Sequence, residues 1–150
     1  MKKAMLLLAV FGLVGLVWAA DPVIGTWKMN PEKSKFSYAT PKSYTITFSA
    51  QDSSIKAVED EVGADGKAIH RSWTAKYDGK DYAVTAPDVD SISVKKPDAN
   101  TAEYVCKKNG KEVWSGRAVI SKDGRTRINT GGGKDEKGQP FTYTIFLEKQ

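Results

Sequence analysis

The sequence predicts an all-β protein, folded as a single antiparallel up-and-down β-barrel of about 8–10 strands with little or no helix in the mature chain. Three observations indicate this class. Turn signals recur every 10 to 15 residues from Gln51 to Lys137, the segments between them mostly alternate apolar and polar residues, and only one long connection interrupts the series. Closure into a barrel removes the two edges of a long meander, whereas a β-sandwich would more often show long crossover connections.

The first twenty residues are predicted to be a secretory signal peptide. Lys2 and Lys3 precede an apolar run at residues 6–17, and the small residues Ala19 and Ala20 follow it. Because this run is short for a membrane span, we expect cleavage after Ala19 or Ala20. The mature protein is then exported to the bacterial periplasm or the extracellular space without a stable membrane anchor. An uncleaved N-terminal anchor is the less favoured alternative.

Residues 21–150 have a suitable length for one barrel domain. Without Lys2 and Lys3, the 23 Lys and Arg become 21 against 18 Asp and Glu, a balance of +3. A charge this small, spread along the chain, argues for solubility and against a nucleic-acid partner. Cys106 is the only cysteine, so an intramolecular disulfide is excluded. We expect Cys106 to be buried and inert rather than exposed and able to pair between chains.

The turn signals divide the mature chain into ten predicted strands. Four Asp-Gly or Asn-Gly dipeptides, at 65–66, 78–79, 109–110 and 123–124, are typical of hairpins. The tightest two-residue hairpin turns need positive φ at both central positions, which Asp, Asn and Gly tolerate. The predicted strands span residues 23–29, 42–49, 54–62, 67–77, 80–86, 90–96, 101–108, 111–121, 124–131 and 139–149.

Two segments do not fit the alternating pattern. In the long connection at residues 31–42, a single helical turn could start after Asn30, since Asn caps helices and proline is tolerated at the first position. Phe36 and Tyr38 would then lie across the open end of the barrel. The glycine-rich segment 131–134 lacks the Ser or Thr and the helix that a phosphate loop requires, so a flexible hairpin loop is predicted.

The first predicted strand carries a glycine-x-tryptophan triplet, Gly25-Thr26-Trp27, close to the mature N-terminus. With the run to Asn30 and the following Lys33-Ser34-Lys35-Phe36, it resembles small exported bacterial lipocalin-like proteins of the calycin superfamily. The resemblance implies a ligand-binding barrel. Fatty-acid-binding proteins of that superfamily insert two helices after the first strand and hold the ligand carboxylate with an arginine and a tyrosine on the last strand. This chain has no helical segment of that length and no arginine at residues 141–147.

Gly25 and Trp27 are assigned structural roles. A large aromatic side chain at a barrel end buries a wide apolar area, so Trp27 is expected to plug that end. Lipocalins usually stack a late arginine over the motif tryptophan. The late basic candidates in this chain are Arg125, Arg127 and Lys149.

The candidate ligand site depends on which face of residues 67–77 points inward. If Arg71 points inward, it is a charged group in a mostly apolar cavity, suited to an acidic head group, and Trp73 and Trp114 supply the wall. In the alternative, Arg71 lies on the outer face or at a rim and covers Trp73 with its stem. Arg117 and Arg127 allow the same two interpretations. The candidate ligand-binding residues are Arg71, Trp73, Trp114, Tyr104 and Phe48.

No pattern in the sequence selects a catalytic residue, a metal site or a cofactor. His70 is the only histidine and is expected to be an exposed strand residue, without a nucleophile motif or a second ligand. The sequence therefore predicts a non-enzymatic protein that binds a small hydrophobic or amphipathic ligand in its interior. The alternative is a structural or protein-interaction module with a filled barrel that acts through its outer surface.

Overall fold

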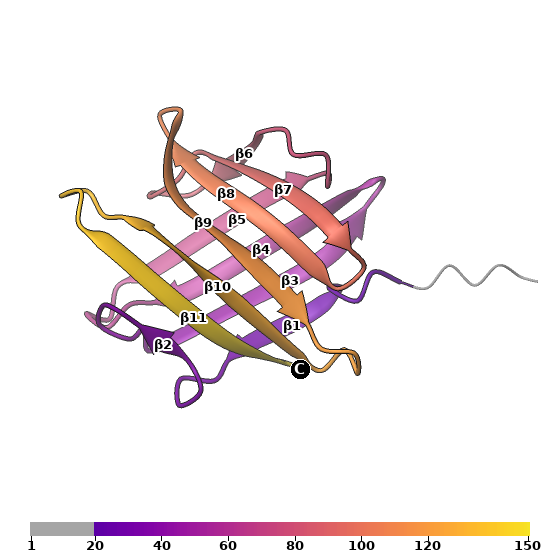
Figure 1. The fold of residues 1–150 in the computed structure, drawn as a ribbon, viewed down its shortest axis with the longest axis horizontal. Helices are drawn as coiled ribbons and strands as arrows, with labels where there is room; N and C mark the ends of the chain where they lie inside the picture. The colour runs from indigo at the N-terminus through magenta and orange to yellow at the C-terminus, as the bar shows by residue number, and fades with distance from the viewer. Residues whose placement is uncertain (1–19) are drawn as a thin grey trace, which may run out of the picture.

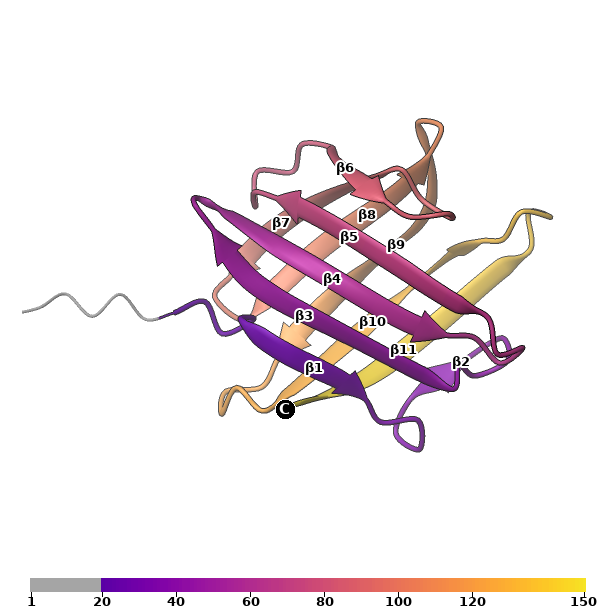
Figure 2. The same ribbon diagram turned by 180° about the vertical axis from the view of Figure 1, so that it is seen from behind.

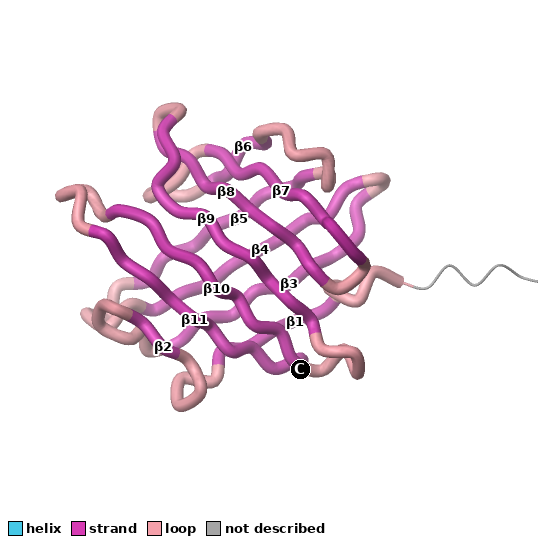
Figure 3. Tube along the Cα trace, viewed as in Figure 1, coloured by secondary structure: helices cyan, strands magenta, loops and turns pink. Residues whose placement is uncertain are grey.

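The computed structural model describes residues 20–150, so the predicted signal peptide lies outside the described residues except for Ala20. This part of the chain contains strands and loops only (Figure 3), and no helix in it could cross a membrane. The strands are β1 (Gly25–Met29), β2 (Lys35–Phe36), β3 (Ser43–Gln51), β4 (Ser54–Val62), β5 (Ala68–Ala75), β6 (Tyr82–Thr85), β7 (Ser91–Asp98), β8 (Thr101–Lys108), β9 (Lys111–Ile120), β10 (Thr126–Lys134) and β11 (Pro140–Lys149).

Ten of these strands close into an antiparallel barrel, and the short β2 adds to β11 (Figures 1 and 2). Consecutive strands pair from β3 to β11, while β1 pairs with both β3 and β11. Trp27 of β1 thus stands opposite Ile46 on one side and Lys149 on the other. Closure gives partners to the backbone groups of the first and last strands. The predicted all-β barrel is confirmed and is consistent with a calycin or lipocalin-like fold.

The helical turn predicted after Asn30 is wrong. Asn30 does cap a turn, because its Oδ1 accepts hydrogen bonds from the backbone N–H groups of Glu32 and Lys33, at 3.1 and 3.2 Å. The chain then follows the free edge of β11, where Ser34 Oγ accepts a hydrogen bond from the N–H of Phe146 at 3.0 Å. Pairing with this edge satisfies the backbone of residues 35–36 as strand β2 and competes successfully with the helix.

The hairpin dipeptides differ in their backbone geometry. Only Asn109 and Gly110 both have positive φ, 50° and 75°, as the tightest turns require. At the three Asp-Gly pairs the glycine alone has positive φ, which corrects the expectation for these turns. Each aspartate instead accepts a hydrogen bond through Oδ1 from the N–H two residues later, at 3.0 to 3.1 Å. These carboxylates stabilise longer turns that need only one left-handed residue.

Trp27 closes one end of the barrel core. Its side chain is 0% exposed, and its Nε1 donates a hydrogen bond to the carbonyl oxygen of Val23 at 2.7 Å. Lys149, not an arginine, crosses the indole, with Nζ 5.1 Å from the ring centroid. Gly25 has a φ of 126°, and a β-carbon there would lie 2.9 Å from Cε of Lys149. A glycine at this position therefore lets the lysine stem cover the tryptophan.

The glycines 131–133 do not form a flexible loop, as predicted, but lie within β10 and pair with β9 and β11. Gly131 stands opposite Gly116 of β9, and Tyr143 and Tyr104 flank the two glycines in the same row. A β-carbon at Gly116 would lie 2.5 Å from Tyr104 Oη, and one at Gly131 equally close to Tyr143 Oη. Residues 116 and 131 are glycines because a tyrosine ring crosses the sheet above each of them.

Candidate functional site

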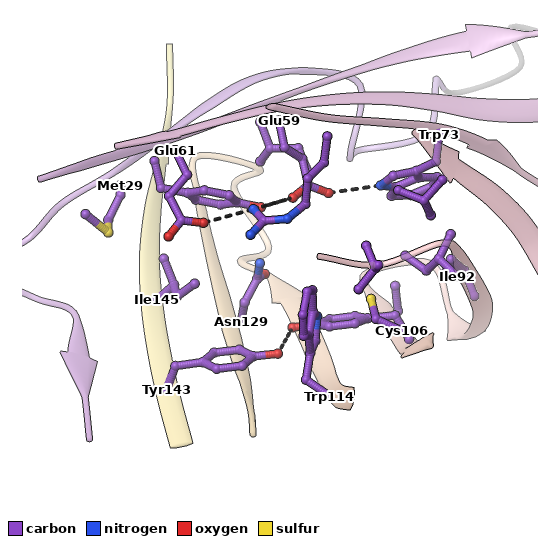
Figure 4. A pocket seen from close by; sticks show the side chains of 18 of the residues that line it. Met29, Glu59, Glu61, Trp73, Ile92, Cys106, Trp114, Asn129, Tyr143 and Ile145 are labelled. Carbon is purple, nitrogen blue, oxygen red and sulfur yellow. Dashed lines mark hydrogen bonds and ion pairs between the residues drawn. The ribbon is translucent and has the colours of Figure 1, made fainter. Parts of the chain in front are cut away.

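The barrel interior contains a cavity of about 400 Å³. Its wall is mostly aliphatic and aromatic, with a few polar groups (Figure 4). This volume lies toward the lower end of the range for small-molecule sites, about 300–1,000 Å³. Two of the lining residues, Tyr38 and Asp135, are exposed. The rings of Phe36 and Phe141 both contact the ring of Tyr38 in edge-to-face geometry. This aromatic group marks the mouth of the cavity, at the end of the barrel away from Trp27.

All five residues that were predicted to bind a ligand line this cavity: Arg71, Trp73, Trp114, Tyr104 and Phe48. On β5, Arg71 and Trp73 point inward, whereas His70 is exposed and its Nδ1 lies 2.8 Å from Asp60 Oδ1. Trp114 lies opposite Cys106 across the β8–β9 pair, and both line the cavity. Cys106 is buried as expected, and burial raises the pKa of its thiol. Among residues 20–150, no three His, Cys, Asp or Glu side chains are grouped to hold a metal ion.

Arg71 belongs to a cluster of four charged groups. Its Nη1 lies 2.9 Å from Glu61 and 3.8 Å from Glu59, and its Nη2 lies 2.5 Å from Asp88. Burial alone lowers the pKa of the guanidinium, but the hydrogen bond and charge of Asp88, with Glu61 and Glu59, outweigh it and raise the pKa. The three carboxylates therefore more than balance the charge of Arg71. It points inward, as one interpretation expected, but it is not a free cation for an acidic head group.

Glu59 is also occupied by hydrogen-bond donors of the cavity wall. Its Oε1 accepts a hydrogen bond from Trp73 Nε1 at 2.9 Å, and its Oε2 accepts one from Tyr44 Oη at 3.1 Å (Figure 4). Both carboxylate oxygens thus have partners besides Arg71. The polar groups on this wall satisfy one another and orient the indole of Trp73.

Arg127 of β10 is the second arginine in the cavity wall, and its environment differs. Its Nε donates a hydrogen bond to Asn129 Oδ1 at 3.0 Å, and its Cζ lies 4.6 Å from the centroid of the Phe48 ring. It is 6% exposed and makes no ion pair with any carboxylate of residues 20–150. Burial lowers the pKa of this guanidinium. The sequence left Arg127 open between an inner and an outer position, and the structure places it inside.

Tyr104 and Tyr143 meet across the two glycines of β9 and β10. Their hydroxyl oxygens are 2.8 Å apart, and the dashed line at the hydroxyl of Tyr143 in Figure 4 marks this hydrogen bond. One of the two hydroxyls donates to the other, and the hydroxyl that accepts keeps its own proton free for another hydrogen bond. Burial raises the pKa of both phenols, which remain neutral donors over the physiological range.

Alkaline pH is expected to unfold the barrel. Burial is the main cause that raises the pKa of Tyr44, Tyr77, Tyr104 and Tyr143 above the ordinary value of 10.0. Because the folded chain keeps protons that the unfolded chain loses, this contribution to stability is complete below pH 10 and declines as the pH rises above it. Tyrosinate absorbance and circular dichroism should therefore change together. Free titration of these tyrosines at pH 10 in a folded barrel would contradict this expectation.

Comparison with known proteins supports the fold. No protein-family model matches the chain, and no curated protein matches it in sequence. Among solved structures, the chain is similar to the one titled "Structure of EF1p2_mFAP2b bound to DFHBI", with a TM-score of 0.50 and 13% sequence identity over 88% of this chain and 97% of that chain. This likeness supports the antiparallel barrel fold of the chain.

Proposed function

We propose that this chain is an exported, non-enzymatic barrel of the calycin type that binds a small hydrophobic or amphipathic molecule in its interior. The cavity of about 400 Å³ carries this proposal, because it joins a wide apolar wall to a few oriented polar groups. Trp73 and Trp114 are only partly buried although they face inward, so they offer apolar surface to a ligand. The likeness to a barrel that is described as bound to DFHBI supports the same function.

The alternative, a filled barrel that acts through its outer surface, has less support. A filled barrel would leave no interior space on the scale of a ligand site. The cavity exceeds the lower limit of about 300 Å³ that separates the two functions. Interior binding is therefore preferred.

Export is part of the proposal and depends on the signal-like N-terminus. The side chain of Asp21 supports it, because Lys96 Nζ lies 2.6 Å from Asp21 Oδ2 and Tyr77 Oη donates a hydrogen bond to the same oxygen at 3.0 Å. Asp21, which follows the predicted cleavage sites at Ala19 and Ala20, thus packs against the barrel. The intact mass of the protein recovered outside the cytoplasm tests this, and a mass that includes the first nineteen residues would exclude cleavage there.

Interior binding is tested with Nile red and a substitution that fills the cavity. Ala102 of β8 lines the cavity, so Ala102→Phe should weaken Nile red binding at least about tenfold by occupying ligand space. The matched control is Val119→Phe, because Val119 is 44% exposed on the neighbouring strand. Fluorescence titration measures both affinities.

The tryptophans provide a second readout of the same titration. Trp114 lines the cavity, so ligand should quench the tryptophan fluorescence of a variant that retains Trp114. Trp27 is fully buried outside the cavity, so ligand should not change the fluorescence of a variant whose only tryptophan is Trp27. Nile red binding that Ala102→Phe leaves unchanged would place the site elsewhere and refute interior binding.

A further inference from the structure

The barrel interior contains one hydrogen-bond donor that stands apart from the others. Nη1 of Arg127 is the only fully buried side-chain nitrogen or oxygen of residues 20–150 without a hydrogen-bond partner. It belongs to a residue that lines the cavity. Buried polar groups are nearly always paired, since an unpaired donor loses its hydration without compensation. A ligand atom that accepts a hydrogen bond would supply the missing partner.

Arg127 also makes no ion pair within residues 20–150, in contrast with Arg71, although the charge of Glu59 acts on it from more than 4.0 Å away. Arg71 has three carboxylates within 4.0 Å, whereas the described residues give Arg127 no ion pair. Its immediate neighbours are the oxygen of Asn129 and the face of Phe48. Glu59, which also faces the interior, has both oxygens engaged by Trp73 and Tyr44. An anion beside Arg127 would therefore pair with a cation that has no other partner.

Other groups of the cavity wall besides Arg127 can donate hydrogen bonds. Asn129 commits its oxygen to Arg127, so its remaining polar atom is the donor Nδ2. The hydroxyl pair of Tyr104 and Tyr143 keeps one proton free to donate. Figure 4 shows Asn129 and Tyr143 entering the cavity from neighbouring strands. A head group that only accepts hydrogen bonds fits these donors, and a carboxylate is such a group.

The position of Arg127 also orients the ligand. Where β10 pairs with β11, Arg127 stands opposite Leu147, near the Trp27 end of the barrel. Gly133 stands opposite Phe141, at the mouth. Six residues of strand separate the two positions, a distance of about 20 Å. The cavity wall, which includes the indoles of Trp73 and Trp114 and the aromatic mouth, is mostly apolar. An apolar tail can occupy this space when the head group lies deep in the barrel.

We propose that the interior ligand is a monoanionic amphipathic molecule, whose acid group accepts a hydrogen bond from Arg127 Nη1 and whose apolar tail points toward the mouth. This inference rests on the proposed function and adds the charge and the orientation of the ligand. It assigns the acid-binding role to Arg127 in place of Arg71.

Matched ligands of one chain length test the proposal. Dodecanoate should bind the wild-type protein about 10- to 100-fold more tightly than dodecanol at neutral pH, as expected for a hydrogen bond to a charged group. Arg127→Met should abolish this preference while dodecanol affinity stays within about threefold, because the apolar wall remains. Arg125→Met is the control, since it removes the same charge from an exposed position two residues away. Isothermal titration calorimetry gives all six affinities.

The outcomes separate this inference from the proposed function. If dodecanol and Nile red bind but dodecanoate binds no more tightly, or if Arg127→Met keeps the preference, the role of Arg127 is refuted and interior binding stands. If none of the three probes binds the wild-type protein, the proposed function itself fails. Should Arg127→Met lose its β-sheet circular dichroism, Arg127→Gln decides by the same affinity ratio, which is expected to fall to near one.

Discussion

Replacing Trp27 by alanine is expected to lower the free energy of unfolding by about 3–5 kcal/mol. The indole is 0% exposed, packs in the core cluster that contains Met29 and Leu147, and donates a hydrogen bond to Val23. Alanine would leave a cavity at the closed end and expose the underside of the Lys149 stem. A loss of this size is a large part of the total stability of a small domain. Urea unfolding followed by circular dichroism measures it.

Two variants separate the packing of Trp27 from its polar contact. Trp27→Phe keeps an aromatic ring but not the hydrogen bond to Val23, so it should be less destabilising than Trp27→Ala. Trp114→Ala removes an indole that is only partly buried at the cavity and should also cost less. If Trp27→Ala destabilised the protein no more than Trp114→Ala, Trp27 would not close the barrel end.

Replacing Arg71 by methionine is expected to lower the free energy of unfolding by about 3 kcal/mol at neutral pH, the lower end for breaking a buried ion pair. Methionine leaves Glu61 and Glu59 mostly buried without their cation, and Asp88 at the rim also loses its partner. The lower figure applies because Asp88 is 31% exposed and water can solvate it. Urea unfolding at neutral pH, followed by circular dichroism, measures the effect.

The control for Arg71 removes two of its three carboxylates together with the cation. Arg71→Met combined with Glu61→Gln and Asp88→Asn should recover most of the lost stability, because the remaining Glu59 keeps its hydrogen bonds from Trp73 and Tyr44. A single Arg71→Met variant as stable as the wild-type protein would show that the carboxylates do not depend on Arg71.

The candidate site was only partly predictable from the sequence. The alternation of residues 67–77 indicated that Arg71 and Trp73 share a face, and the structure places that face inside. The neutralisation of Arg71 could not be read, because Asp88 approaches from a loop 17 residues away. In β10 the pattern misleads, since Ile128 points outward and is 39% exposed while Arg127 and Asn129 point inward. Apolar alternation alone would have placed this strand the wrong way round.

The sequence by itself determined the ten barrel strands and the positions of the turns, because Asp-Gly and Asn-Gly signals and two-residue alternation act over a few neighbouring residues. It also determined that Cys106 forms no intramolecular disulfide. Only the tertiary structure decided that residues 35–36 pair with the edge of β11, that glycines 131–133 lie within β10 with Gly131 under a tyrosine ring, and that Arg127 keeps an unpaired donor. Each of these depends on partners brought together by barrel closure, so no local pattern encodes them.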